Sequence, residues 1–129
     1  MKRILIVEDD DALRGTLADQ LSGSFEVLQA ADGEDAVTKV VDGKPDMVLL
    51  DLMLPKLDGF KVLERIRQYP DPSVATLPVV VLSNLWSQKD ILQVQGLHIE
   101  DYFVKAHTDI KDVIKKVKGL LNTKTGAKQ

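Results

Sequence analysis

Five polar side chains stand at the ends of short apolar runs, and their types suit phosphate chemistry. The runs end at Glu8 and Asp9, at Asp51, at Ser83 and at Lys105. Short runs rich in Val, Ile and Leu are typical of strands buried on both faces of a parallel sheet. Because open α/β sheets bind ligands at the carboxyl ends of their strands, we expect these side chains to meet at one edge. Such a group could hold a divalent cation, offer a carboxylate nucleophile and neutralise a phosphoryl group.

Each of these side chains has a chemical role that its type allows. Carboxylates gathered at one point repel one another unless a cation neutralises them, and Mg²⁺ prefers such oxygens, so Glu8, Asp9 and Asp51 predict a magnesium site. Asp51 follows a wholly apolar run and could also accept a phosphoryl group, giving an aspartyl phosphate. Lys105 would then supply positive charge to the phosphoryl oxygens, and Ser83 would donate a hydrogen bond to one of them.

The rest of the chain alternates strand and helix patterns, which predicts an α/β fold with repeated βα units. The expected strands are Ile4–Val7, Phe25–Ala30, Asp46–Leu50, Pro78–Leu82 and Asp101–Val104. The expected helices carry Leu13 to Leu21, Ala36 to Val41, Phe60 to Arg67, Ser87 to Gln95 and Ile110 to Leu121. Right-handed crossovers over this pattern give a doubly wound five-stranded parallel sheet in strand order 2-1-3-4-5.

Several local signals mark where these elements begin and end. Asp10 or Asp11 is expected to cap the first helix rather than bind metal, and Ser87 to cap the fourth. Asp32-Gly33 is expected to form a turn after the second strand. Residues 2–121 are expected to form one domain, followed by a frayed polar tail over residues 122–129.

Composition and charge exclude several classes of protein. The 129 residues are 44% hydrophobic and 29% charged, as in an ordinary globular domain. A net charge of −3 provides no field that favours direct binding of nucleic acid. There are no cysteines for a disulfide or thiolate metal site, and no apolar run is long enough to cross a membrane. The basic start Met1-Lys2-Arg3 leads into a run too short for a signal peptide, so the cytoplasm is the expected compartment.

Three motifs in this order closely resemble the receiver domain of two-component response regulators. They are Ile4–Asp10, Asp51–Gly59 and Val104-Lys105, and the resemblance covers residues 2–121. It implies the flavodoxin-like (βα)5 receiver fold of the CheY-like superfamily. It also implies a phosphorylation-dependent signalling switch, a protein that accepts phosphate rather than an enzyme that turns over a substrate.

The resemblance implies a role for each matching residue. Asp51 would be the phosphoacceptor, and Lys105 would bind the phosphoryl group. Mg²⁺ would be held by Glu8, by Asp9 as a direct ligand, by Asp51 and by the backbone carbonyl of Met53. Ser83 would be the switch hydroxyl and Tyr102 the switch aromatic, while Pro55 and Asp58-Gly59 would shape the loop that precedes the third helix.

Partners also follow from the resemblance. The phosphodonor would be a sensor histidine kinase or a phosphotransfer protein. The phosphorylated form would act on a downstream effector protein or on an output domain absent from this chain, and it could form a homodimer. No contact with a membrane is expected.

Four features depart from the receiver pattern. Asn84 stands where receivers commonly have a small residue, so its amide could narrow access to the acyl phosphate or donate a hydrogen bond to the phosphoryl group. Ala106 replaces a proline that often follows a cis peptide, and a trans peptide is expected here. Residues 96–101 lack the usual glycine-alanine pair, so the partner-binding face is the least transferable part. Trp86 is expected to cover the loop after Ser83.

The side chains two positions beyond the phosphoacceptor and the switch hydroxyl are Met53 and Leu85. Neither can orient or deprotonate water as an acid or an amide could. We therefore expect a persistent phosphoryl group.

Two other functions stay open at this point. A phosphatase of the haloacid dehalogenase type also uses a strand-end aspartate, a hydroxyl and a lysine, but it needs a second acid where this chain has Met53. A degenerate receiver would bind partners without phosphorylation. The intact acids argue against that second alternative, whereas Asn84 and Ala106 keep it open.

Overall fold

The computed structural model describes residues 1–85 and 87–126, so the prediction for Trp86 lies outside the described residues. Its centre is a five-stranded sheet in the order β2-β1-β3-β4-β5, in which every pairing is parallel. The predicted fold and strand order are confirmed. The strands are β1 (Arg3–Val7), β2 (Glu26–Ala30), β3 (Met47–Leu50), β4 (Val79–Ser83) and β5 (Asp101–Val104).

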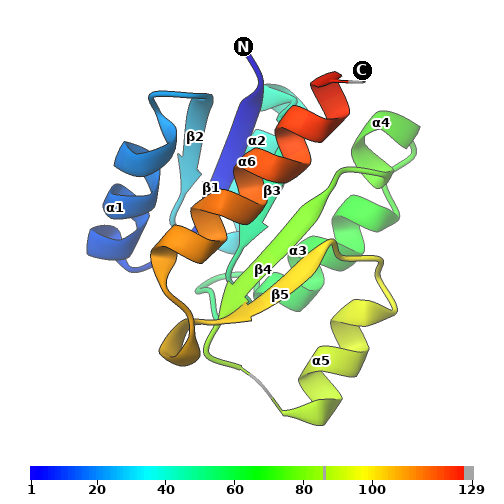
Figure 1. Ribbon diagram of the computed structural model, residues 1–129. Helices are drawn as coiled ribbons and strands as arrows, with labels where there is room; N and C mark the ends of the chain where they lie inside the picture. Colours follow the sequence, from blue (N-terminus) through cyan, green and yellow to red (C-terminus); the bar gives the residue numbers. More distant parts are fainter. Residues whose placement is uncertain (86, 127–129) are drawn as a thin grey trace.

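Helices cover both faces of this sheet (Figure 1). They are α1 (Asp11–Leu21), α2 (Gly33–Gly43), α3 (Gly59–Arg67), the short α4 (Pro72–Ala75), α5 (Gln88–Gln95) and α6 (Ile110–Gly126), with a 3₁₀ turn η1 (Lys105–His107) after β5. Helices α1 and α6 lie on one face, and α2, α3 and α5 on the other. The N-terminus and the end of α6 lie where the strands begin, opposite the loops that follow the strands (Figure 1).

Side chains that alternate along the central strands feed two separate hydrophobic cores. Ile4 and Ile6 of β1 pack with α1 and α6, whereas Leu5 and Val7 pack with α2 and α3. All four are essentially inaccessible to solvent. Because both faces of the strand are buried, the run is apolar throughout, which is why the sequence pattern identified it.

Polar caps begin most of the helices. Asp10, Asp32, Asp58 and Ser87 each accept a hydrogen bond from the backbone N–H three residues ahead. The predictions for Asp10 and Ser87 are confirmed. The expected turn at Asp32-Gly33 is wrong, because Asp32 satisfies an otherwise unpaired N–H and α2 therefore starts at Gly33.

Two more elements differ from the sequence prediction. Helix α4 was not expected, because the prolines around it resemble stop signals. Pro72 instead occupies the first turn, where no N–H is needed, behind an Asp71 cap. Helix α6 runs to Gly126, so residues 122–126 of the expected tail are helical. Adding residues to a packed helix requires no new nucleation, and this favours such an extension.

Two further expectations concern the backbone and the membrane. Over residues 1–85 and 87–126 every peptide bond is trans, including the one before Ala106. Within the same ranges, no helix combines the length and the apolar character that a membrane span requires.

The start of α2 supports the loop between β3 and α3. The N–H of Gly33 donates to the carbonyl of Pro55 at 3.3 Å. A Cβ at Gly33 would lie only 1.7 Å from the carbonyl oxygen of Leu57. Beside this contact, Lys56 Nζ lies 3.5 Å from Asp32 Oδ2. The loop after β3 thus packs directly on the backbone of α2, which only a glycine permits.

We expect Gly33→Ala to lower the free energy of unfolding by about 2 kcal/mol, because the new methyl group must displace the backbone at Leu57. The matched control is Gly15→Ala in α1, where a Cβ meets nothing within 4 Å. That change should raise stability by roughly 0.5–1 kcal/mol through helix propensity. Urea denaturation of the three proteins checks both signs, and equal effects at the two glycines would contradict the packing argument.

Candidate functional site

The loops after β1, β3 and β5 bring two acids and a lysine into direct contact. Lys105 Nζ lies 2.7 Å from Glu8 Oε1 and 2.7 Å from Asp51 Oδ2. The side chains of Glu8 and Asp51 are only 2% and 4% exposed, and that of Lys105 is 20% exposed. One ammonium group therefore neutralises two nearly buried carboxylates.

The electrostatics of these groups follow from burial and from their contacts. Burial raises the pKa of Glu8, the hydrogen bond from Lys105 opposes this shift, and the charge of Asp51 adds to it. Burial alone would lower the pKa of Lys105, but its hydrogen bonds to Asp51 and Glu8 outweigh that effect and raise it. The lysine therefore remains a cation at neutral pH.

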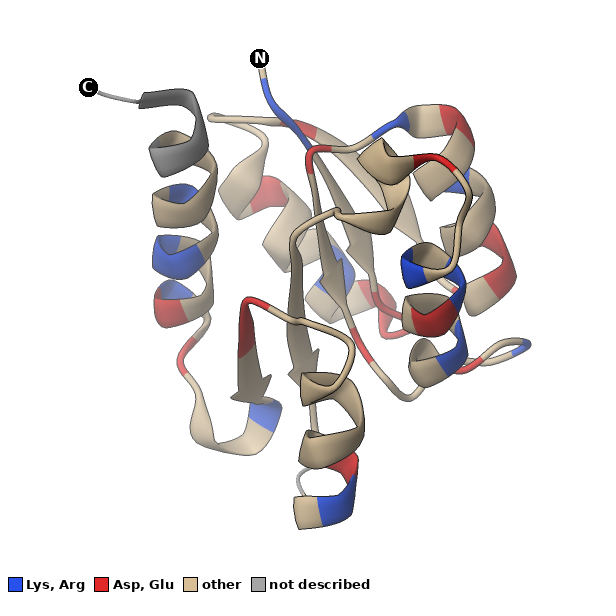
Figure 2. Cartoon of the chain, turned by 90° about the vertical axis from the view of Figure 1, so that its right-hand side faces the viewer, with Lys and Arg blue, Asp and Glu red and all other residues tan. Residues whose placement is uncertain are grey.

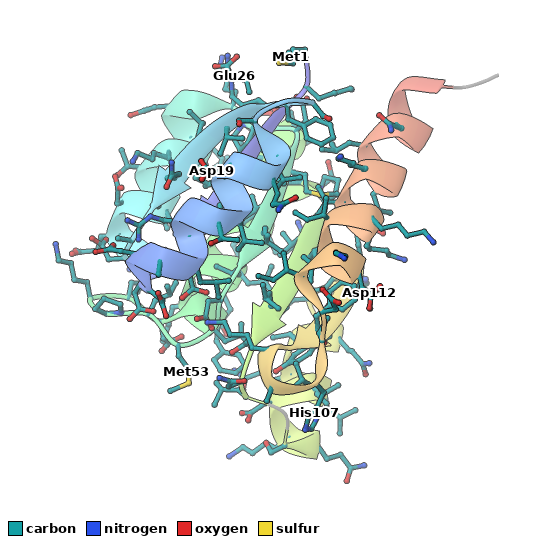
Figure 3. The ribbon with its side chains drawn as sticks, turned by 60° about the vertical axis from the view of Figure 1, so that its left-hand side comes forward. Met1, Asp19, Glu26, Met53, His107 and Asp112 are labelled. Carbon is teal, nitrogen blue, oxygen red and sulfur yellow. The ribbon has the colours of Figure 1, made fainter. Side chains whose placement is uncertain are left out.

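Asp9 completes an acidic group at this edge of the sheet. One carboxylate oxygen from each of Glu8, Asp9 and Asp51 can be chosen so that all lie within 4.8 Å of one another, and Asp9 is exposed. The Met53 N–H donates to Asp51 Oδ1 at 3.0 Å, which orients that carboxylate. The Met53 side chain is 55% exposed, and it lies at the same end of the molecule as His107 (Figure 3).

Ser83 is the last residue of β4 and is fully buried. Its hydroxyl oxygen accepts a hydrogen bond from the Leu85 N–H at 3.3 Å. The Tyr102 hydroxyl donates to the Leu85 carbonyl, so Tyr102 of β5 holds the loop that follows Ser83. Burial, followed by the negative charges of Asp90 and Asp51, raises the pKa of Tyr102, which keeps its hydroxyl a donor.

Asn84 contacts the loop that carries Lys105. Its carboxamide oxygen, Oδ1, accepts a hydrogen bond from the Ala106 N–H at 3.0 Å. From the sequence, Asn84 and Ala106 were two separate departures from the receiver pattern, and no contact between them was predicted. Both His98 and His107 are exposed.

Two supporting contacts were not predicted from the sequence. The Arg14 guanidinium donates to the Glu8 carbonyl at 2.8 Å and to Asp11 Oδ1 at 2.7 Å, which fixes the loop between β1 and α1. A Cβ at Gly59 would lie 2.3 Å from the carbonyl oxygen of Asp51, so α3 starts directly against the strand end. Nothing in the sequence marked Arg14, whereas Gly59 was expected only to shape the loop.

Sequence comparison assigns the family. The sequence model described as "Response regulator receiver domain" matches residues 4–118. The chain belongs to the response regulator receiver domain family. This assignment makes it a signalling domain, and it removes the phosphatase alternative, which belongs to another family.

Similar proteins include several transcriptional regulators. The DNA-binding dual master transcriptional regulator RpaA of Synechocystis is 37% identical over 122 residues, covering 94% of this chain and 49% of RpaA. The alkaline phosphatase synthesis transcriptional regulatory protein PhoP of Bacillus subtilis is 34% identical over 121 residues, covering 93% of this chain and 48% of PhoP. The chain thus spans about half the length of the curated relatives it matches.

Solved structures agree with this assignment. The Mn²⁺-bound form of response regulator Rcp1 superposes with a TM-score of 0.78 at 32% identity, covering 100% of this chain and 98% of Rcp1. A CheY-like receiver domain protein from Methanospirillum hungatei has a TM-score of 0.85 at 24% identity, covering 98% of this chain and 99% of that one. The second likeness concerns the fold alone.

In the absence of divalent metal, we expect Lys105→Met to destabilise the receiver domain by about 2 kcal/mol, because Glu8 and Asp51 lose their shared cation. The matched control is Lys56→Met, since the Lys56 side chain is 61% exposed in its pair with Asp32. Removing that surface pair should cost less than about 1 kcal/mol. Urea unfolding of both variants in chelator measures the difference, and equal losses would mean that burial of the two acids does not matter.

Proposed function

We propose that this receiver domain is a switch controlled by phosphorylation of Asp51. The observation that carries the proposal is the contact of a nearly buried Asp51 carboxylate with the Lys105 ammonium, beside two further acids. A carboxylate held in this way is positioned as a nucleophile, and the neighbouring cation can neutralise an incoming phosphoryl group.

A phosphohistidine can donate the phosphoryl group to Asp51. An Asp51 carboxylate oxygen attacks the phosphorus atom, the phosphorus–nitrogen bond of the donor breaks, and the imidazole leaves and takes up a proton. Lys105 can then bind the phosphoryl oxygens, since its ammonium already reaches Asp51 Oδ2. Ser83 would donate its hydroxyl to a phosphoryl oxygen.

The donor set fits a magnesium ion. Three carboxylate oxygens lie within 4.8 Å of one another, and receiver domains, the family of this chain, bind Mg²⁺ at an acidic pocket. Glu8, Asp9, Asp51 and the Met53 carbonyl would hold the ion. When bound, Mg²⁺ would neutralise charge on the acids and on the phosphoryl oxygens.

The switch would act through the loop after Ser83. If the Ser83 hydroxyl turns to the phosphoryl group, the Leu85 N–H loses its acceptor and the loop moves inward. Tyr102, bonded to the Leu85 carbonyl, would follow into the vacated space. The surface that changes is formed by α5, β5 and α6. After Asp90, α5 has no charged residue (Figure 2). It also exposes Leu92, which suits contact with a protein.

Partners are proposed from the same family membership. A sensor histidine kinase or a phosphotransfer protein would supply the phosphoryl group in the cytoplasm. The output would be a downstream effector or an output domain, because the chain covers only about half of several transcriptional regulators. We also propose that the phosphorylated form can make a homodimer. The receiver domain itself would make no direct contact with nucleic acid.

We expect acetyl phosphate with Mg²⁺ to add one phosphoryl group to the wild-type protein and none to Asp51→Asn. Asparagine keeps the size of the side chain but cannot form an acyl phosphate. Intact mass spectrometry follows the label. Labelling of Asp51→Asn, or no labelling of the wild type, would reject the proposal. Addition of a chelator should abolish labelling, and a receiver that binds partners without phosphorylation would take no label under any of these conditions.

The aspartyl phosphate should persist, because Met53 and Leu85 cannot orient water. We expect the aspartyl phosphate of the Met53→Asn variant to hydrolyse on the order of tenfold faster than that of the wild type, since an amide can position water for attack. The matched control is Leu92→Asn on α5, an exposed apolar residue away from the acids, which should leave the lifetime unchanged. Loss of the label within seconds in the wild-type protein would contradict this prediction.

A further inference from the structure

One hydrogen bond joins the two loops that flank Asp51. Asn84 lies directly after β4, and Ala106 is the second residue of the η1 turn. The Ala106 N–H donates to Asn84 Oδ1 at 3.0 Å, across 22 positions of sequence. Only the oxygen of a carboxamide can accept from an N–H, so this contact also fixes which way the amide faces.

Within the described residues, the start of the η1 turn lacks a cap of its own. No side chain caps it from its own N-cap residue, Val104. Its closing backbone bond, from the Thr108 N–H to the Lys105 carbonyl, is long at 3.5 Å. The first N–H groups of any helical turn have no partner within the turn. Asn84 supplies the missing acceptor from a neighbouring loop, as a capping side chain would.

The residue that begins this turn is Lys105, whose ammonium contacts both Glu8 and Asp51. A lysine side chain is long and flexible, so the position of its backbone limits where the charge can be held. A displacement of such a charged group by about 1 Å can lower the reaction rate on the order of a hundredfold.

We propose that Asn84 is a positioning residue that acts through Ala106 to hold Lys105 against Asp51. This inference rests on the proposed phosphorylation of Asp51 and deepens it. It differs from direct binding of the phosphoryl group by the Asn84 amide, because here the effect depends on Lys105. It also links the two loops, since Asn84 follows Ser83 immediately and any movement of Ser83 acts on the same bond.

Two variants separate the effect of the hydrogen bond to Ala106 from the effect of side-chain size. Asn84→Leu removes the acceptor at similar volume, and Asn84→Asp keeps an acceptor oxygen in the same place. Hydrogen exchange at the Ala106 amide should be fast in Asn84→Leu and slow in both the wild type and Asn84→Asp. Gln93→Leu, which removes an exposed amide from α5, is the control and should change nothing.

A double-mutant cycle shows whether the effect passes through Lys105. With acetyl phosphate and Mg²⁺, Asn84→Leu should slow labelling of Asp51 about threefold to tenfold in the wild-type background. In the Lys105→Met background it should have no further effect. An equal slowing in both backgrounds would show direct contact with the phosphoryl group and overturn the proposal, as would an Asn84→Leu variant that labels as fast as the wild type.

A second cycle does not depend on phosphorylation. In chelator, the effects of Asn84→Leu and Lys105→Met on the free energy of unfolding should be less than additive if Asn84 holds Lys105 in its contact with the acids. Additive effects would overturn the inference. If the wild-type protein took no label, the proposed function would fail, while the unfolding cycle would still decide the role of Asn84.

Discussion

The structure depends on one ammonium group shared by two nearly buried carboxylates. Glu8 and Asp51 leave water when the sheet forms, and such burial is unfavourable unless a cation accompanies them. Lys105 satisfies both at 2.7 Å. Because the three residues follow different strands, the contact forms only when β1, β3 and β5 have their correct order in the sheet. The contact that the chemistry of the site needs therefore also requires the correct order of the strands.

The supporting contacts become understandable from this constraint. The loop after β3 is packed at both ends, since Gly33 admits the carbonyl of Leu57 and Gly59 admits that of Asp51. Arg14 fixes the carbonyl of Glu8 from helix α1. None of these residues reaches the Asp51 carboxylate itself. They hold the backbone from which the charged side chains extend, and a group of like charges needs such support because its members repel one another.

The sequence predicted most of the fold and the composition of the site, because both follow from local patterns. Runs buried on two faces are apolar throughout, and the residues that end them must lie at one edge. What it missed depends on contacts across the chain. Gly33 looked like a turn residue, and its packing on Leu57 is visible only in three dimensions. Asn84 and Ala106 each looked like an isolated departure, and their pairing needed the proximity of two loops.

The part of the molecule best placed to change is also weakly buried. Every residue of β5 is partly exposed, and in α5 only Val94 is buried. Helix α5 is nevertheless held at both ends. Arg67 donates to the carbonyls of Leu97 and His98 beyond its C-terminal end, and Tyr102 binds Leu85 ahead of its first turn. Few buried apolar contacts lower the free energy of local opening, so a segment anchored at its ends and weakly packed between them is sensitive to a change at one anchor. The Leu85 N–H donates a hydrogen bond to Ser83, and the Leu85 carbonyl accepts one from Tyr102. A change at Ser83 therefore acts directly on the anchor at Leu85.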